Sequence, residues 1–294
     1  MKAKYASFLA CPACGGTIVP EGASKLRCTA CAKLYPIIRG IPVFIETGTL
    51  SDHAHGQIAY FSEKTKIYDS LQPVESPWQK KYLDRFFRNI PKPSGKLIID
   101  DACGSGYVSV ESAKRGAFVI ACDINMAALI RLAGIAKQLK LDSRILPVCC
   151  TAEALPLQKN VADGIVANAI LEHLPREGEA IASMSRVIKK GGIAMVTVPL
   201  AYSLVNPLLL PVHYALDKRI GHLRRYTKEM LVARFSGWKA LDVLYTGHTR
   251  KVMKTLINVL APVFDPQEIE KEDDRLAEKK RFASNISILF RKKP

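Results

Sequence analysis

The sequence predicts an α/β protein in which a doubly wound, mostly parallel sheet follows a small N-terminal metal-binding domain. Short apolar runs alternate with helix-like segments from about residue 96 onward, which is the rhythm of strands joined by helices. Two closely spaced cysteine pairs precede that region. At 294 residues, with 48% hydrophobic and 24% charged side chains, the chain is long enough for one large core and an accessory domain.

The first motif is a pair of cysteine knuckles with the spacing C-x2-C-x13-C-x2-C. Its members are Cys11, Cys14, Cys28 and Cys31. Four thiolates at this spacing suit one tetrahedral Zn²⁺ and leave no coordination position for water, so we expect a structural ion. Disulfides or free thiols are the alternative, which a reducing compartment disfavours.

The residues around the knuckles, CPACGG and LRCTACAKLYPIIRGIPVF, resemble the small zinc-binding activator proteins that partner methyltransferases of tRNA, rRNA and a translation factor. The resemblance covers about residues 8–45. It implies that this segment stabilises the rest of the chain or helps to hold substrate. We therefore assign residues 1–50 to a zinc-ribbon domain and residues 51–95 to a helical linker or lid.

The main domain is expected over residues 96–294, with a substrate-side insertion at 199–235. Its predicted strands are LIID, FVIACD, RILPVCC, DGIVAN and IAMVTV, and SNISILFRKK near the end of the chain reads as a last strand. In a parallel sheet of this kind, ligands bind at the carboxyl ends of the strands, beside the first strand-to-helix turn.

That turn reads IIDDACGSGYVSV. The strand ends at Asp100, and Ala102, Gly104 and Gly106 allow the backbone to approach a ligand closely. A dinucleotide fingerprint would have Gly or Ala at Ser109, and a phosphate-binding P-loop would have Lys-Ser or Lys-Thr after the last glycine. Neither is present.

The second strand ends in Asp123, seventeen residues beyond Gly106. A carboxylate there can accept hydrogen bonds from both ribose hydroxyls of a nucleoside. The alternative is that Asp123 caps the helix that starts at this point.

The series DACGSG, ACDIN, CCTAEALPL, ADGIVANAILEHL and RVIKKGGIAMVTVP resembles the class I S-adenosylmethionine-dependent methyltransferases, especially the branch acting on small molecules, quinones and lipids. The likeness runs from about Lys96 to Pro199 and implies a seven-stranded, Rossmann-like sheet. It also implies the cofactor site: Asp100, Ala102, Gly104 and Gly106 at the methionine end, Asp123 and Ile124 at the ribose, Thr151, Ala152 and Glu153 around the adenine, and Asn168 below the sulfonium. Ala102 replaces a family glycine, and Thr151 replaces the acidic residue that usually contacts the adenine amino group.

On the acceptor side, His173 is the first candidate for a general base, because it follows the fourth strand in NAILEHL. Glu172 and His173 orienting the loop is an equally weighted alternative. The resemblance adds His222 and Tyr226, although Thr227 and its neighbours also read as a helix start. Tyr60, Phe61 and Tyr68 lie where the family places a lid over the cofactor, with ordinary packing as the alternative.

The formal net charge is +16, and its excess is uneven. Residues 97–210 hold 11 basic and 10 acidic side chains, against 6 and 2 in residues 1–50 and 7 and 2 in residues 211–240. Such a field attracts an anionic partner.

The sequence is compatible with three functions. The first is methylation of oxygen or carbon in a small or lipid-like acceptor, suggested by the apolar segments VPLAYSLVNPLLLPVHYAL and LINVLAPVF. The second is methylation of RNA, suggested by the basic flanks, although no Asn-Pro-Pro-aromatic signature occurs. The third is a cofactor-binding scaffold without activity.

The start of the chain has no apolar run followed by a small-residue cleavage site, so we expect a cytoplasmic protein with possible peripheral contact to a membrane. The apolar stretch at residues 193–216 is interrupted by Pro199, Pro207 and Pro211, which favours a buried strand followed by an apolar lid over a transmembrane helix.

Overall fold

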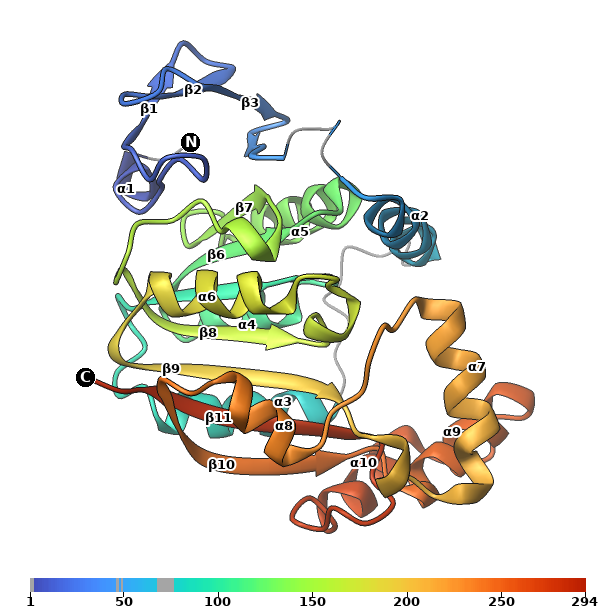
Figure 1. The fold of residues 1–294 in the computed structure, drawn as a ribbon. Helices are drawn as coiled ribbons and strands as arrows, with labels where there is room; N and C mark the ends of the chain where they lie inside the picture. Colours follow the sequence, from blue (N-terminus) through green and yellow to red (C-terminus); the bar gives the residue numbers. More distant parts are fainter. Residues whose placement is uncertain (1–2, 46–47, 49, 68–76) are drawn as a thin grey trace.

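The computed structural model describes residues 3–45, 48, 50–67 and 77–294, and it holds two sheets (Figure 1). Tyr68 of the predicted lid lies outside the described residues. The larger sheet has seven strands in the order β10-β11-β9-β8-β5-β6-β7. The smaller one is a four-stranded antiparallel sheet in the order β1-β2-β3-β4.

The strands of the large sheet are β5 (Leu97–Asp101), β6 (Phe118–Asp123), β7 (Ile145–Cys149), β8 (Ala162–Asn168), β9 (Ile188–Pro199), β10 (Trp238–Thr246) and β11 (Asn285–Lys292). Neighbours from β7 to β9 pair in parallel, and β11 runs antiparallel to both β9 and β10. The five predicted strands and the last strand are confirmed. Their apolar runs are buried on both faces, as a covered parallel sheet requires.

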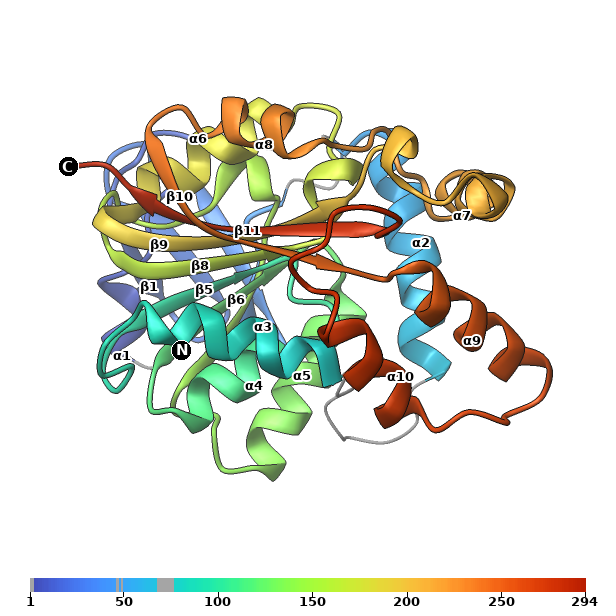
Figure 2. The same ribbon diagram turned by 90° about the horizontal axis from the view of Figure 1, so that it is seen from below.

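Helices cover both faces of this sheet, so the doubly wound prediction is confirmed. Figure 2 shows α3 (Pro77–Arg88), α4 (Tyr107–Lys114) and α5 (Met126–Gln138) on one face, with α6 (Glu177–Val187) and α8 (Lys228–Arg234) on the other. The remaining helices are α1 (Ala3–Ala6), α2 (Asp52–Ile67), α7 (Leu210–Ile220), α9 (Thr249–Leu260) and α10 (Pro266–Asp274).

The segment expected as a linker or lid divides into two different parts. In α3, Tyr82, Leu83 and Phe86 are fully buried and pack in one cluster with Ile98 and Val166 of the sheet. Helix α3 therefore belongs to the core of the main domain. Helix α2 instead lies beside the carboxyl ends of the strands, at the same end of the sheet as α7 and α9 (Figures 1 and 2).

The N-terminal sheet comprises β1 (Ile18–Glu21), β2 (Lys25–Cys28), β3 (Leu34–Ile38) and β4 (Ile41–Pro42). It docks beside the β7 edge of the large sheet (Figure 1). The Phe44 N–H donates to the Cys149 carbonyl at 2.8 Å, and the Ala10 N–H donates to the Pro156 carbonyl at 2.9 Å. Tyr5 and Leu9 are buried in the same apolar cluster as the main sheet, so the two parts share one core.

The apolar stretch after β9 forms two 3-10 turns and one short α-helix. It continues through the 3-10 turns η4 (Tyr202–Leu204) and η5 (Pro207–Leu209) into the 11-residue helix α7. Among the described residues, no helix combines the length and apolar character that crossing a membrane demands.

Candidate active site

The loop between β5 and α4 has the backbone that its small residues predict. Ala102, Gly104 and Gly106 all have positive φ, at 59°, 46° and 79°. A Cβ on Gly106 would lie 2.5 Å from the Leu132 side chain, so both conformation and packing require glycine there. A Cβ on Gly104 would meet nothing within 4 Å, which leaves an open face beside the loop.

Asp100 holds this loop to the helix that follows it. The Ser109 hydroxyl donates to Asp100 Oδ2 at 2.6 Å, and both side chains are buried. Burial raises the pKa of Asp100 to about 7. Ser109, which stands where a dinucleotide-binding fingerprint would have Gly or Ala, therefore holds the Asp100 side chain in place by a hydrogen bond.

Asp123 connects the second strand to the same loop. Its Oδ2 accepts from the Gly104 N–H at 2.9 Å, and its Oδ1 accepts from the Asn125 N–H at 2.8 Å. Helix α5 is capped by Asn125, whose side chain accepts from Ala127 and Ala128. The capping alternative for Asp123 is thus wrong, and Ile124 lies between Asp123 and the residue that caps the helix.

The residues expected around the adenine lie at the turn η2 (Ala152–Ala154) after β7. Thr151 precedes it without making a side-chain cap, and Ala152 is buried. Burial raises the pKa of Glu153. At the end of β8, Asn168 Oδ1 is buried and has no partner among the described residues.

Asp101 is a functional candidate that the sequence reasoning missed. It is 1% exposed, and its Oδ2 has no partner among the described residues. Burial, reinforced by the nearby Glu153 carboxylate, raises its pKa to about 8. The sequence signal that could have identified Asp101 is the consecutive pair Asp100-Asp101. Because consecutive strand residues face opposite sides of a sheet, only one of the two carboxyls can contact Ser109, and the other needs a separate environment.

The acceptor side brings two of the three predicted catalytic residues together. His173, in the turn η3 (Leu171–His173), and His222 lie with ring centroids 4.7 Å apart. His222 Nε2 is 3.8 Å from Glu172 Oε1. Burial raises the pKa of Glu172 to about 8 and lowers that of His173 to about 4, so both are neutral near pH 7.

Asp217, also missed from the sequence, orients His222. Its Oδ1 lies 2.9 Å from His222 Nδ1, and Arg225 donates to its two oxygens at 2.5 and 2.8 Å. Although burial alone would raise the pKa of Asp217, hydrogen bonds from His222, Arg225 and Tyr202 lower it. Asp217 is thus an ionised partner for the His222 ring.

Tyr226, the third predicted catalytic residue, is fully buried, and its hydroxyl donates to the Glu177 carboxylate. Thr227 accepts from the Met230 N–H as the cap of α8, as the helix-start interpretation predicts. The catalytic assignment of Tyr226 stays a prediction.

Helix α2 bridges the cofactor side and the acceptor side. His53 Nε2 lies 2.9 Å from the His173 carbonyl oxygen, and Phe61 packs edge-on against the His173 ring at 5.8 Å. Farther along the helix, the Ser62 hydroxyl donates to Asn125 Oδ1 at 3.2 Å. These contacts place α2 against the turn that carries His173 and against the cap of α5, and its role as a lid stays a prediction.

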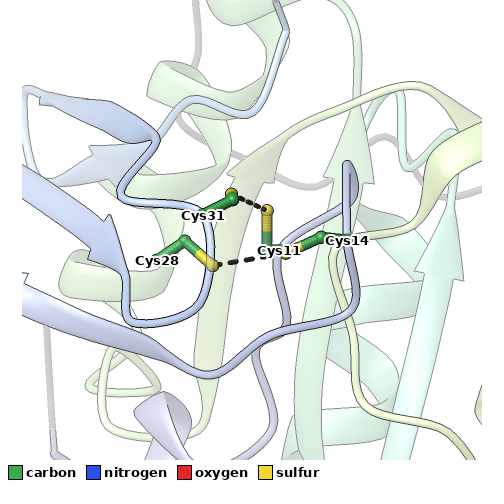
Figure 3. A group of neighbouring side chains, drawn as sticks. All are labelled: Cys11, Cys14, Cys28 and Cys31. Carbon is green, nitrogen blue, oxygen red and sulfur yellow. Dashed lines mark hydrogen bonds between the residues drawn. The ribbon is translucent and has the colours of Figure 1, made fainter.

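The four knuckle cysteines converge on one point (Figure 3). Their sulfurs all lie within 4.8 Å of one another, with 3.7 Å between Cys11 and Cys31 and 3.5 Å between Cys14 and Cys28. The Tyr35 hydroxyl lies 2.9 Å from the Cys11 sulfur. Four thiols without a disulfide suit Zn²⁺ in their donor chemistry.

A cleft of about 570 Å³ separates the first knuckle from the adenine-side turn, and Cys14, Glu153 and Glu179 are among its lining residues. The first cysteine pair and Glu153 of the expected cofactor site therefore face a shared space.

Residues 99–196 match the family model described as a methyltransferase domain. The chain is 34% identical over 99 residues to a ubiquinone biosynthesis O-methyltransferase of Hahella chejuensis, covering 33% of this chain and 40% of that protein. It is 30% identical over 142 residues to a tRNA (carboxymethyluridine(34)-5-O)-methyltransferase of Arabidopsis thaliana, covering 45% and 31%. The chain thus matches less than half the length of either relative.

Solved structures confirm the fold. A putative sarcosine dimethylglycine methyltransferase from Galdieria sulphuraria aligns with a TM-score of 0.60 at 14% identity, covering 81% of this chain and 98% of that one. A geranyl diphosphate C-methyltransferase from Streptomyces coelicolor aligns with a TM-score of 0.58 at 13% identity, covering 82% and 98%. The seven-stranded sheet therefore has the Rossmann-like fold of these solved structures, and residues 99–196 are the part of the chain that matches the methyltransferase-domain model.

Proposed function

We propose that the chain is an S-adenosylmethionine-dependent methyltransferase that methylates oxygen or carbon in a small-molecule or lipid-like acceptor. The observation that carries this proposal is one arrangement at the carboxyl edge of the sheet. There the open loop, Asp123 and Asn168 lie on the cofactor side, and Glu172, His173 and His222 lie beyond them under α2.

The site has the features that this cofactor requires. The open face at Gly104 accommodates the methionine end, the Asp123 carboxylate has lone pairs left for ribose hydroxyls, and the unpartnered Asn168 oxygen can accept an N–H. When bound, S-adenosylmethionine supplies a methyl group activated by a sulfonium. The protein then has to align the acceptor with that methyl group and to exclude water. We propose that α2, which contacts His173 and Asn125, excludes the water.

A proton must leave the acceptor when it is a hydroxyl. His173 is neutral and has a free lone pair, but its lowered pKa makes it a weak base. His222 is the second candidate, because Asp217 Oδ1 holds its Nδ1 at 2.9 Å and leaves Nε2 directed toward Glu172. We assign the base role to the pair, with Asp217 positioning His222.

The small-molecule assignment is supported by the ubiquinone biosynthesis relative and by apolar side chains near the lid. Leu208 is 86% exposed, and Tyr214 and Leu216 of α7 are also exposed. An apolar acceptor, or the surface of a membrane that carries it, would cover such side chains. On this proposal the enzyme acts in the cytoplasm or at a membrane surface.

The Cys11, Cys14, Cys28 and Cys31 cluster is proposed to hold a structural Zn²⁺. All four ligands come from the protein, so the ion takes no part in methyl transfer. Its role is to hold the small sheet that docks beside β7.

RNA is the second candidate acceptor, favoured by the tRNA methyltransferase relative and by the basic excess in residues 1–50 and 211–240. The test incubates the purified protein with radiolabelled S-adenosylmethionine and cell extract. We expect solvent-extractable label, abolished in Asp123→Ala and retained in Asp84→Asn, whose carboxylate is half exposed and pairs with Arg115. Label lost on ribonuclease treatment would assign RNA instead.

A further inference from the structure

We propose that Glu172, His173 and His222 form a second metal site, for a divalent transition ion, on the acceptor side. One ligand atom from each residue lies within 4.8 Å of the other two. Glu172 and His173 come from the turn after β8, and His222 follows the end of α7, so two separate segments converge on the point. This cluster has no cysteine and is separate in sequence from the four knuckle cysteines.

Two polar atoms of these residues are buried and unused. Glu172 is 1% exposed and His173 is 7% exposed. Glu172 Oε2 and His173 Nδ1 have no hydrogen-bond partner among the described residues. Burying such groups without a partner is unfavourable, and folded proteins pair nearly all of them. A cation held by the cluster would give these side chains the partner that they lack.

His222 is also held in the manner of a metal ligand. It directs Nδ1 to Asp217, which leaves Nε2 facing Glu172. Metal-binding histidines usually give one ring nitrogen to a carboxylate or carbonyl in this way, which orients the other toward the ion. His173 is held through its backbone, because its carbonyl oxygen lies 2.9 Å from His53 Nε2, while its Nδ1 has no partner among the described residues.

The donor set indicates the kind of ion. Two imidazoles and one carboxylate suit Zn²⁺, Co²⁺ or Fe²⁺ better than Mg²⁺ or Ca²⁺, which prefer oxygen donors. Arg225 and Asp217 neutralise each other, so Glu172, which releases its proton when it binds a cation, supplies the anionic ligand. Ligands of a tetrahedral zinc lie about 3.3 Å apart, so no pair of ligand atoms would have to close by more than about 1.5 Å on binding.

The role of the ion rests on the proposed function and refines it. Three protein ligands leave at least one coordination position for an oxygen atom. An acceptor hydroxyl at that position would have its pKa lowered by the cation, which reduces the need for a basic side chain. His173 and His222 would then be ligands, and the acceptor would be a hydroxyl compound, methylated on oxygen.

The test separates this site from the knuckles by spectroscopy. Protein whose cysteine site is filled with Zn²⁺ is titrated with Co²⁺, and the cobalt d–d absorption is followed. We expect one equivalent to bind without a thiolate-to-cobalt band. Binding should disappear in His222→Ala and persist in His55→Ala, whose ring is exposed and outside the cluster. Asp217→Asn should weaken binding by about 10–100-fold while keeping all three ligands.

Absence of cobalt binding in folded wild-type protein, or equal binding in His222→Ala, would overturn the site. Because this readout needs no turnover, it is independent of the methyltransferase proposal, which calorimetry with S-adenosylmethionine tests on the same samples. Methyl transfer that does not respond to Co²⁺ in a cobalt-binding protein would overturn the role assigned to the ion.

Discussion

At the scale of single residues, Asp123 has a structural role beside the ribose contact that we propose for it. Its two oxygens accept backbone N–H groups from Gly104 and Asn125, so one carboxylate positions both the loop and the start of α5. The cofactor hydroxyls would use its remaining lone pairs.

We predict that Asp123→Asn lowers the affinity for S-adenosylmethionine by roughly 10- to 100-fold, because a charge-assisted hydrogen bond contributes about 1.5–3 kcal/mol. Isothermal titration calorimetry measures the change, with Asp84→Asn as the control. An unchanged dissociation constant in Asp123→Asn would show that this carboxylate does not contact the ribose.

The raised pKa of Asp101 leads us to predict that the stability of the folded protein depends on pH. The pKa of this carboxyl is raised from 3.8 to about 8 in the folded protein, so between about pH 4 and pH 8 the unfolded chain loses this proton while the folded chain keeps it. The contribution of Asp101 to the free energy of unfolding therefore falls as pH rises through that window and levels off above it.

Accordingly, Asp101→Asn should be stabilised relative to the wild type at pH 7.5, with a smaller difference at pH 4.5. Denaturant unfolding at both pH values measures it. Because other buried carboxyls titrate in the same window, the quantity to compare is the difference between variant and wild type. A difference that is constant with pH would contradict the assignment.

At the scale of elements, the N-terminal sheet acts as a support for the adenine-side turn. Backbone hydrogen bonds from Phe44 and Ala10 reach Cys149 and Pro156, on either side of η2. The segment between them carries Thr151, Ala152 and Glu153, so the small sheet holds both ends of the part of the chain expected to face the adenine.

We predict that removing zinc with a strong chelator lowers the melting temperature by roughly 5 °C or more, because Leu9 and its neighbours lose part of their burial, worth about 2 kcal/mol. Cys14→Ser should behave like the chelated protein, and Cys103→Ala, outside the cluster, should keep its zinc. Differential scanning fluorimetry and metal analysis provide the readouts. An unchanged melting temperature after verified zinc loss would exclude a supporting role.

At the scale of the whole molecule, basic segments flank the nearly neutral residues 97–210 along the sequence. An apolar acceptor gains little from that field, whereas RNA binding depends on it through the release of counterions. We therefore predict that KM for the acceptor changes less than about threefold between 50 and 200 mM salt, where binding through many phosphates weakens by about 10³-fold or more. Steady-state kinetics in both salts decide this point, and a steep salt dependence would favour RNA.

The sequence alone determined the parts of this protein that follow from local pattern. Strand positions followed from short apolar runs, the loop conformation from Ala102, Gly104 and Gly106, and the convergence of four cysteines from their spacing. These features depend on backbone geometry within a few residues, which is why they are readable along the chain.

The tertiary structure alone decided which side chains meet and which are buried. Asp217 lies beside His222, His53 reaches the His173 carbonyl across 120 positions, and helix α3 enters the core instead of the lid. Asp101 is buried near Glu153, and this environment raises its pKa. The residues next to Asp101 in the sequence do not indicate that it lies near Glu153. Such partnerships arise from packing between distant segments, because burial and neighbouring charges, not residue type alone, set the chemistry of an ionisable group.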